Sequence, residues 1–199
     1  MTTNDAPPLS RRERKKRETR LRILEAALIL MGERGYDAVK VEDIAKRADV
    51  ANATFFLHFP TKASLITAFN EMVTDKIVDR LQGFDLPAIE KLELARALVL
   101  DEWAQHSNMM RSIVVDAARY GDSFDADDSL ARLIGDIVKE GQESGDFALE
   151  YDPKIVADCL MAGWRAASLQ WATTGDDERA RQANRQALDM ILFGISARR

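Results

Sequence analysis

The sequence predicts an all-α fold, and three observations support that prediction. Apolar residues recur at helical spacing in several long segments, for example at Ile23, Ala27, Leu30 and Met31. Runs of alternating β-branched and aromatic residues are lacking, as are the Asn-Gly and Asp-Gly pairs of tight hairpins. The 199 residues are 46% hydrophobic and 31% charged, which is typical of globular proteins and sufficient for one or two domains.

Caps, prolines and glycines divide the chain into nine predicted helices. A capping-box pattern at Ser10, or alternatively Thr19, can start the first helix, and Gly35 is expected to end it in a left-handed conformation. Thr61 can cap the fourth helix, and the Asp152-Pro153 pair marks the start of the eighth. The helices are expected to end near residues 34, 47, 59, 82, 106, 120, 144, 173 and 195.

Composition excludes several kinds of site. The single cysteine, Cys159, rules out an internal disulfide, and with only His58 and His106 beside it a metal site is not expected. No apolar run approaches the roughly 20 residues that span a bilayer, and the chain begins with polar residues. We therefore expect a cytoplasmic protein with no membrane partner, no metal and no cofactor.

Charge is unevenly distributed along the chain, whose net charge is −5. Residues 1–62 carry 13 Lys and Arg against 9 Asp and Glu, whereas residues 63–199 carry 15 against 24. Within the first part, residues 11–22 hold eight basic and two acidic side chains. Such a basic block is typical of nucleic-acid binding, although a solvated tail or a charged helix face has the same composition.

The stretch from Val41 to Lys62 has the pattern of a helix-turn-helix. Such a motif needs a first helix with a small, apolar inner face, a tight turn, and a second helix that can enter the major groove. Asp49 stands at the turn, where a left-handed conformation is expected and Asp tolerates it. The predicted inner face consists of Ile44, Ala45 and Ala48, with Val50 packed beneath the turn. The second helix is predicted to expose hydrogen-bonding groups: Asn52, Thr54 and His58. Phe55 and Phe59 are predicted to be core residues.

This pattern resembles the TetR family of bacterial transcriptional regulators. The matching run is ILEAALILMGERGYDAVKVEDIAKRADVANATFFLHFPTKASL, residues 23–65, and a second likeness lies in GQESGDFALEYDP, residues 141–153. Three positions depart from the family pattern, because Asp49 replaces a usual Gly, Ala51 a capping Ser or Thr, and Phe56 a Tyr. Losing the cap at Ala51 should cost about 0.5–2 kcal/mol locally.

The resemblance implies a set of DNA contacts. Asn52 and Ala53 would face the bases, where Asn can pair with adenine and an alanine methyl can meet a thymine methyl. The basic residues 11–22 could reach flanking phosphates or the minor groove. The remaining contacts that the resemblance implies, mostly to the sugar-phosphate backbone, are those of Lys40, Val41, Thr54, Phe56, His58 and Lys62.

The resemblance also implies a nine-helix architecture with two parts. Residues 10–82 would form a DNA-binding domain, with a three-helix head (helix-turn-helix at about 40–59) and a linking fourth helix, after a disordered tail at residues 1–9. Residues 83–199 would form a bundle for ligand binding and dimerisation. The expected pocket residues for a largely apolar small-molecule effector are Trp103, Met110, Ile113 and Trp164, although residues at helical spacing more often belong to an ordinary core.

Dimerisation is expected through residues 153–195, where the eighth and ninth helices would form a four-helix bundle with their symmetry mates. The sequence is compatible with close helix approach there, at small residues and their apolar neighbours: Gly163, Ala167, Ala183, Ala187, Gly194, Leu160, Trp171, Met190 and Ile191. The implied function is a ligand-responsive transcriptional repressor that binds palindromic operator DNA as a homodimer and leaves it when the effector binds.

Other functions remain as alternatives. An enzyme is not expected, because the GxSxG elbow, the Gly-rich phosphate loop ending in GK[ST] and the HExxH zinc motif are lacking, but dispersed catalytic groups would leave no local motif. A helical adaptor with an inactive head would bind no duplex even at low salt. A DNA-binding architectural regulator would bind DNA but no small molecule.

Overall fold

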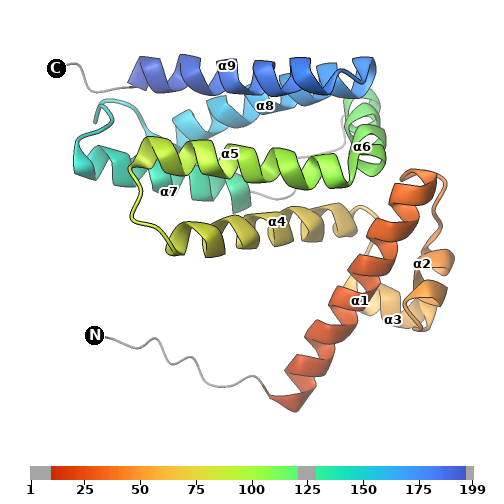
Figure 1. Ribbon diagram of the computed structural model, residues 1–199. Helices are drawn as coiled ribbons and strands as arrows, with labels where there is room; N and C mark the ends of the chain where they lie inside the picture. Colours follow the sequence, from red (N-terminus) through yellow and green to blue (C-terminus); the bar gives the residue numbers. More distant parts are fainter. Residues whose placement is uncertain (1–9, 121–128, 196–199) are drawn as a thin grey trace. The chain divides into compact units, whose positions relative to one another are not determined.

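A computed structural model describes residues 10–120 and 129–195, and these ranges confirm the all-α prediction. The described residues contain nine helices in the order that the sequence predicts (Figure 1). They are α1 (Arg11–Arg34), α2 (Val41–Arg47), α3 (Asn52–His58), α4 (Ser64–Gln82), α5 (Ala88–Gln105), α6 (Ser107–Tyr120), α7 (Ser129–Ser144), α8 (Pro153–Thr174) and α9 (Asp177–Ile195). The tail expected at residues 1–9 lies outside the described residues, as does the expected start of the seventh helix.

Two helix starts are fixed by side chains next to them in sequence. Ser10 Oγ accepts a hydrogen bond from the Glu13 amide at 3.2 Å, and the Ser10 amide donates to Glu13 Oε2 at 2.8 Å. This complete capping box places the start of α1 at Ser10 rather than at Thr19. Asp152 Oδ1 accepts from the Lys154 amide at 2.7 Å, so the predicted start of α8 is confirmed.

Two predicted boundaries differ in detail. Gly35 ends α1 with a φ of 80° but a ψ of 160°, so the expected left-handed helical conformation is wrong, although the positive φ still favours glycine. Thr61 does cap α4, because its Oγ1 accepts from the Ser64 amide at 3.2 Å. The helix itself begins only at Ser64, since Thr61 acts from three residues before it.

The chain divides into two compact units, residues 1–65 and 66–199, with the division just inside α4. In the first unit, α1 packs against α2 and α2 against α3. The second half of α1 supplies the core contacts, because its buried side chains begin at Ile23. The core of this unit contains Ile23, Ala27, Leu30, Met31, Val39, Ile44, Phe55 and Phe59.

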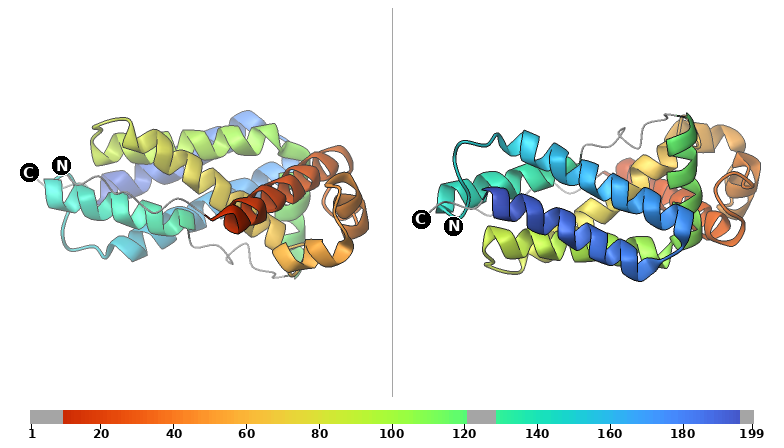
Figure 2. Two further views of the ribbon diagram at one scale, coloured as in Figure 1. Left: turned by 90° about the horizontal axis from the view of Figure 1, so that it is seen from below. Right: turned by 90° about the horizontal axis from the view of Figure 1, so that it is seen from above.

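In the second unit, α8 is the central helix. It packs against α6, α7 and α9, while α5 packs against α7 (Figures 1 and 2). Thr74 of α4 hydrogen-bonds to Ser129 of α7 at 3.0 Å, and Lys76 of α4 pairs with Glu102 of α5 at 2.8 Å. None of the helices described is both long enough and apolar enough to cross a bilayer.

The connection from α7 to α8, residues 145–152, is fastened to the end of α7. Gln142 Nε2 donates to the carbonyls of Ala148 at 2.8 Å and Tyr151 at 2.7 Å. Gly141 of α7 lies directly under the buried ring of Phe147 and leaves no room for a side chain of its own. This loop lies within the second segment, residues 141–153, that carries the sequence resemblance.

The small residues of α8 and α9 pack mainly within the chain. A Cβ on Gly163 would come within 3.0 Å of the Ala187 Cβ, so these two positions form the close approach between α8 and α9. Leu160, Ala167 and Trp171 are buried, whereas Gly163 and Ala187 are half-buried. The expected place of Leu160, Ala167 and Trp171 on a dimer surface is therefore wrong, because neighbouring helices of the same chain cover them.

A different face of α8 and α9 is left uncovered. Its exposed residues on α8 follow helical spacing and are apolar or small, and α9 adds two large side chains: Ile155, Cys159, Ala162, Ala166, Leu169, Met190 and Phe193. We call these seven residues the apolar stripe. Phe193 and Met190 are 89% and 73% exposed, which is far more than their hydrophobicity favours in a single chain.

Candidate nucleic-acid interface

A tight turn joins α2 to α3. Ile44, Ala45 and Ala48 are buried on the inner face, and the Val50 amide donates to the Ala45 carbonyl at 3.0 Å. Asp49 has a φ of 53°, the single positive φ at a non-glycine residue within the described ranges. The left-handed turn predicted at Asp49 is confirmed, and so is the helix-turn-helix geometry that depends on it.

The first residues of α3 present small groups to solvent. Asn52 and Ala53 are exposed at its start, where the resemblance places base contacts. One turn further, Phe56 is 51% and Leu57 76% exposed. The sequence analysis did not name Leu57 as an exposed residue. The signal was present, because Phe55 is predicted to be buried and a residue two positions later lies on the opposite side of a helix. The outer face of α3 is therefore polar at its start and apolar at its end.

Aromatic packing and one arginine fix α3 against α1. Phe55 and Phe59 are fully buried, as predicted, with ring centroids 5.8 Å apart. Arg20 of α1 donates from Nη1 to the His58 carbonyl at 3.0 Å, and its guanidinium lies 4.6 Å from the centre of the Phe59 ring. The end of α3 therefore cannot rotate without breaking its contacts with α1.

His58 is held in its neutral form. Burial lowers the pKa of its imidazole, and the positive charges of Lys16 and Arg20 lower it further. Its Nδ1 is buried, and no group in the described part of the chain bonds to it. A bare lone pair is less costly to bury than an unpaired N–H, so we infer that the proton lies on Nε2. That assignment makes Nε2 the hydrogen-bond donor of this side chain.

Lys62 makes contacts within its own unit. Its Nζ donates to the Tyr36 carbonyl at 2.8 Å and to the Val39 carbonyl at 3.2 Å. The same ammonium lies 4.1 Å from the centre of the Tyr36 ring. Lys62 therefore ties the segment before α4 to the loop between α1 and α2, and its contact with a DNA phosphate stays a prediction.

The other predicted DNA contacts lie around the same turn. Lys40 is exposed and extended at the start of α2, Val41 follows it half-buried, and Thr54 is half-buried on α3. No side chain caps α3, as expected from Ala51 at this position. Lys40 and Val41 thus lie at the start of α2, and Asn52 and Ala53 at the start of α3.

Comparison with known proteins identifies this architecture. Residues 23–69, which include the whole helix-turn-helix, match the sequence model described as bacterial regulatory proteins of the tetR family. Residues 23–69 therefore carry the helix-turn-helix segment of the TetR family. The predicted role of the chain as a DNA-binding transcription regulator rather than an enzyme is therefore confirmed.

Relatives extend this likeness over most of the chain. The HTH-type transcriptional repressor DhaR of a Mycobacterium species (strain GP1) is 24% identical over 184 residues, 87% of this chain and 88% of that protein. KstR of Rhodococcus jostii, also a transcriptional repressor, is 27% identical over 92% of this chain and 86% of its own. The TetR-family repressor FadR of Thermus thermophilus, solved with lauroyl-CoA, shares the fold with a TM-score of 0.70 at 22% identity, over 90% of this chain and 96% of its own.

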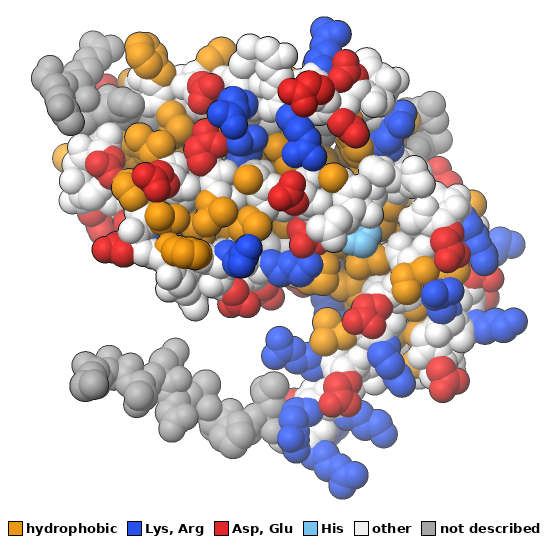
Figure 3. All heavy atoms as spheres, in the orientation of Figure 1, with side chains coloured by type: hydrophobic (Ala, Val, Ile, Leu, Met, Phe, Trp, Pro, Cys, Tyr) orange, Lys and Arg blue, Asp and Glu red, His pale blue; other side chains and the backbone are white. Residues whose placement is uncertain are grey.

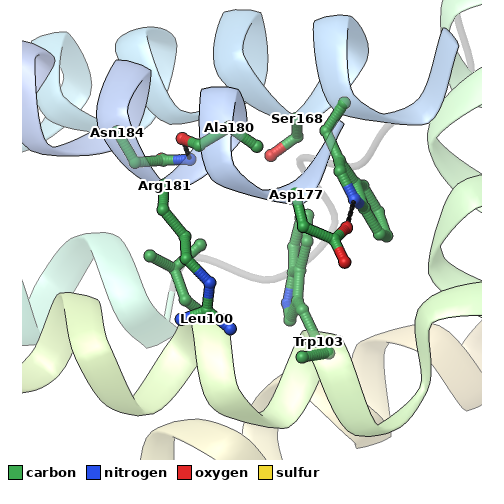
Figure 4. Close-up of a pocket in the computed structure, with 9 residues that line it drawn as sticks. Leu100, Trp103, Ser168, Asp177, Ala180, Arg181 and Asn184 are labelled. Carbon is green, nitrogen blue, oxygen red and sulfur yellow. Dashed lines mark hydrogen bonds between the residues drawn. The ribbon is translucent and has the colours of Figure 1, made fainter. Parts of the chain in front are cut away.

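In the second unit, two cavities lie along the seam between α5, α8 and α9. The outer cavity contains about 400 Å³ of empty space, its open mouth included, and is lined by Trp103, Trp171, Arg181 and Asn184 among others (Figure 4). Trp171 Nε1 donates a hydrogen bond to Asp177 Oδ1 of α9. The inner cavity contains about 310 Å³ of empty space, open solvent included, and is lined by residues about two turns away on each helix, Trp164 among them.

The four predicted pocket residues are not gathered at either of these two cavities. Trp103 lines the outer cavity and Trp164 the inner one, while Met110 and Ile113 are buried and line neither. The sequence analysis missed Arg96, which lines the inner cavity, is only 7% exposed, and bonds to Glu93 Oε2 at 2.9 and 3.0 Å. No local signal marks it, because an Arg three residues after a Glu is typical of exposed helix faces.

Proposed function

We propose that this protein represses transcription by binding palindromic operator DNA as a homodimer, and that a small-molecule effector releases it. The observation that carries the proposal is the exposed start of α3, where Asn52 and Ala53 follow the left-handed turn at Asp49. A recognition helix contacts bases with its amino-terminal residues, and this geometry leaves those residues uncovered. The match to the TetR family model supports the same assignment.

The proposed contacts divide into reading and positioning groups. Asn52 and Ala53 read bases, whereas Phe56 packs on a sugar and His58 donates from Nε2 to a phosphate. The remaining positioning contacts are those of Lys40, Val41, Thr54 and Lys62.

The apolar stripe is the proposed dimer surface. A two-fold interface must be complementary to itself, and an apolar face with small residues at its centre meets that condition. This surface lies within residues 153–195, and it supports the division into a DNA-binding part, residues 10–82, and a ligand-binding and dimerisation part, residues 83–199. Burying Phe193 and Met190 in a second copy would remove the two most exposed large apolar side chains of α9 from water.

The dimer surface is tested with Ala166→Asp. Ala166 is exposed within the stripe, so the new carboxylate should meet its symmetry mate and shift the protein towards monomers. Gln105→Asp, at an exposed position of α5, is the matched control for the added charge. Sedimentation velocity measures the outcome, and an Ala166→Asp variant as dimeric as the control would place the interface elsewhere. Ala187→Asp is a poorer test, because Ala187 packs against Gly163 in the same chain.

The effector is proposed to bind along the seam of α5, α8 and α9. Its two cavities lie about two turns apart on all three helices, which suits an elongated and largely apolar molecule. Trp103 and Trp164 would contact it directly, and the buried Met110 and Ile113 would yield as the cavities join. The complex of the related FadR with lauroyl-CoA supports a ligand of this shape. A cytoplasmic location follows from the proposed role.

Intrinsic fluorescence can report effector binding without a label. All three tryptophans of the chain, Trp103, Trp164 and Trp171, line the two cavities, so an effector in the seam should change their emission. The operator is first selected from random duplexes, and candidate effectors are then titrated with and without it. The operator must weaken effector affinity by the same factor by which the effector weakens operator affinity. Equal effector affinities would rule that molecule out, and selection of no inverted repeat would contradict the dimeric operator.

A further inference from the structure

The first half of α1, residues 11–22, is helical without being part of a core. Every side chain there is exposed except those of Thr19 and Arg20, which are half-buried, and the buried positions begin at Ile23. The capping box at Ser10 nevertheless holds the helix to its first residue. We call this segment the basic rod; it extends about 18 Å at 1.5 Å per residue.

The basic rod carries most of the positive charge of the first unit. It holds eight basic and two acidic residues, whereas residues 40–62, which contain the helix-turn-helix, hold four basic and three acidic ones. The recognition helix α3, NATFFLH, contains no Lys, Arg, Asp or Glu. In Figure 3, Lys and Arg side chains gather along this part of α1. Attraction to a polyanion must therefore come mainly from the rod.

One side of the rod lies near the end of α3. Arg20 donates to the His58 carbonyl at 3.0 Å, and the charges of Lys16 and Arg20 both act on the His58 imidazole. Arg12, Lys16 and Arg20 follow one another at intervals of four residues, so they lie on one side of the helix. From Arg12 to Arg20 the axis advances about 12 Å, which is close to the rise of three to four base pairs along one strand.

We propose that the basic rod binds DNA phosphates beside the bases that α3 reads, and that it supplies most of the sequence-independent affinity. This inference rests on the proposed function. It assigns affinity and base preference to different helices: the rod holds DNA of any sequence, and the nearly uncharged α3 discriminates between sequences.

DNA fits the rod better than a membrane surface does. A helix that lies on a bilayer needs an apolar face to insert, and Leu21 is the only large apolar residue between residues 11 and 22. Ion pairing does not compete for the charges either: within the described residues, no carboxylate pairs with Arg12 or Lys16. Both side chains are therefore available to phosphate oxygens.

The test is the double variant Arg12→Gln/Lys16→Gln, in which glutamine keeps the helix propensity of the rod. Its matched control is Arg132→Gln/Lys139→Gln, which removes two exposed charges from α7 and gives the same net charge. Binding to random-sequence duplex is measured by fluorescence anisotropy over a range of salt concentrations, and circular dichroism checks that both variants remain helical. Binding to anionic phosphatidylserine vesicles is measured in parallel.

Each neutralised phosphate adds about 0.9 to the steepness of log affinity plotted against log salt concentration. The slope measured for the double variant should therefore be shallower than that of wild type by about 1.8. Over a fourfold rise in salt, wild type should thus lose about tenfold more affinity than the double variant. The control should keep the wild-type slope. The ratio of operator to random-duplex affinity, measured at one salt concentration, should be similar in all three proteins.

Three results would overturn the inference. One is a double variant with the wild-type slope, and another is a control whose slope falls as much as that of the double variant. The third is tight vesicle binding by wild type that the double variant loses while its DNA binding is unchanged. A wild-type protein that bound no duplex at low salt would overturn the proposed function as well, which separates the two failures.

Discussion

Replacing Lys62 by methionine should destabilise the first unit, because it removes an ammonium that satisfies two backbone carbonyls. The Nζ bonds to Tyr36 at 2.8 Å and to Val39 at 3.2 Å are hydrogen bonds from a charged donor, worth about 1.5–3 kcal/mol each when well shielded. The ring contact at 4.1 Å adds about 0.5–1 kcal/mol. Since Lys62 is half-buried, we expect a total loss of about 2–4 kcal/mol.

Urea denaturation monitored by circular dichroism measures this loss, with the exposed Lys46→Met as the control for removing a lysine charge. The second readout is the salt dependence of DNA binding, which separates the two roles of Lys62. A residue that only ties the loop leaves the slope unchanged in the variant that still folds, whereas a phosphate contact contributes about 0.9 to it. If Lys62→Met were as stable as Lys46→Met and its DNA affinity depended less steeply on salt than that of wild type, Lys62 would contact phosphate rather than stabilise the loop, and the reasoning would be refuted.

Three further predictions test local features of the fold. Asp49→Gly should keep or raise the free energy of unfolding, whereas Asp49→Val should lower it by about 1–2 kcal/mol, because a β-branched residue tolerates the φ of 53° poorly. Thermal melting should show Gly141→Ala to be less stable than wild type, since its Cβ would overlap the ring of Phe147. Gly135→Ala, with its nearest neighbour 3.7 Å away, should be unharmed. The pKa of His58 lies below its usual 6.5, so the unfolded state binds more protons as pH falls below that value. The free energy of unfolding of the wild type should therefore decrease as the pH falls below 6.5, and that of His58→Gln should decrease less steeply. Urea titrations at several pH values measure both, and equal dependence of the unfolding free energy on pH would contradict the prediction.

The sequence predicts local features of this fold well, because their causes lie within a few residues of each other. The capping box at Ser10, the Asp152-Pro153 start and the left-handed Asp49 are all determined by neighbouring atoms. Phe55 and Phe59 could likewise be assigned to the core, since their spacing of four residues places them on one side of a short helix.

The sequence does not predict which partner each helix face meets. Both faces of α8 repeat small and apolar residues at helical spacing, so periodicity alone cannot tell that Gly163 packs against Ala187 while Ala166 faces outwards. The burial of Arg96 could not be predicted for a similar reason, because it depends on α7, α8 and α9 rather than on the neighbours of Arg96 in sequence. The contacts of Lys62 with Tyr36 and Val39 join segments more than twenty residues apart, as their separations of 26 and 23 show.

The exposed position of Cys159 gives this protein a natural reporter of subunit association. It is the only cysteine in the chain, and it lies within the apolar stripe of α8. Because the proposed dimer buries this stripe, the thiol should react readily in monomers and slowly in dimers. The rate of its reaction with a thiol reagent would therefore follow dissociation of the subunits at one defined site, without any prior mutagenesis.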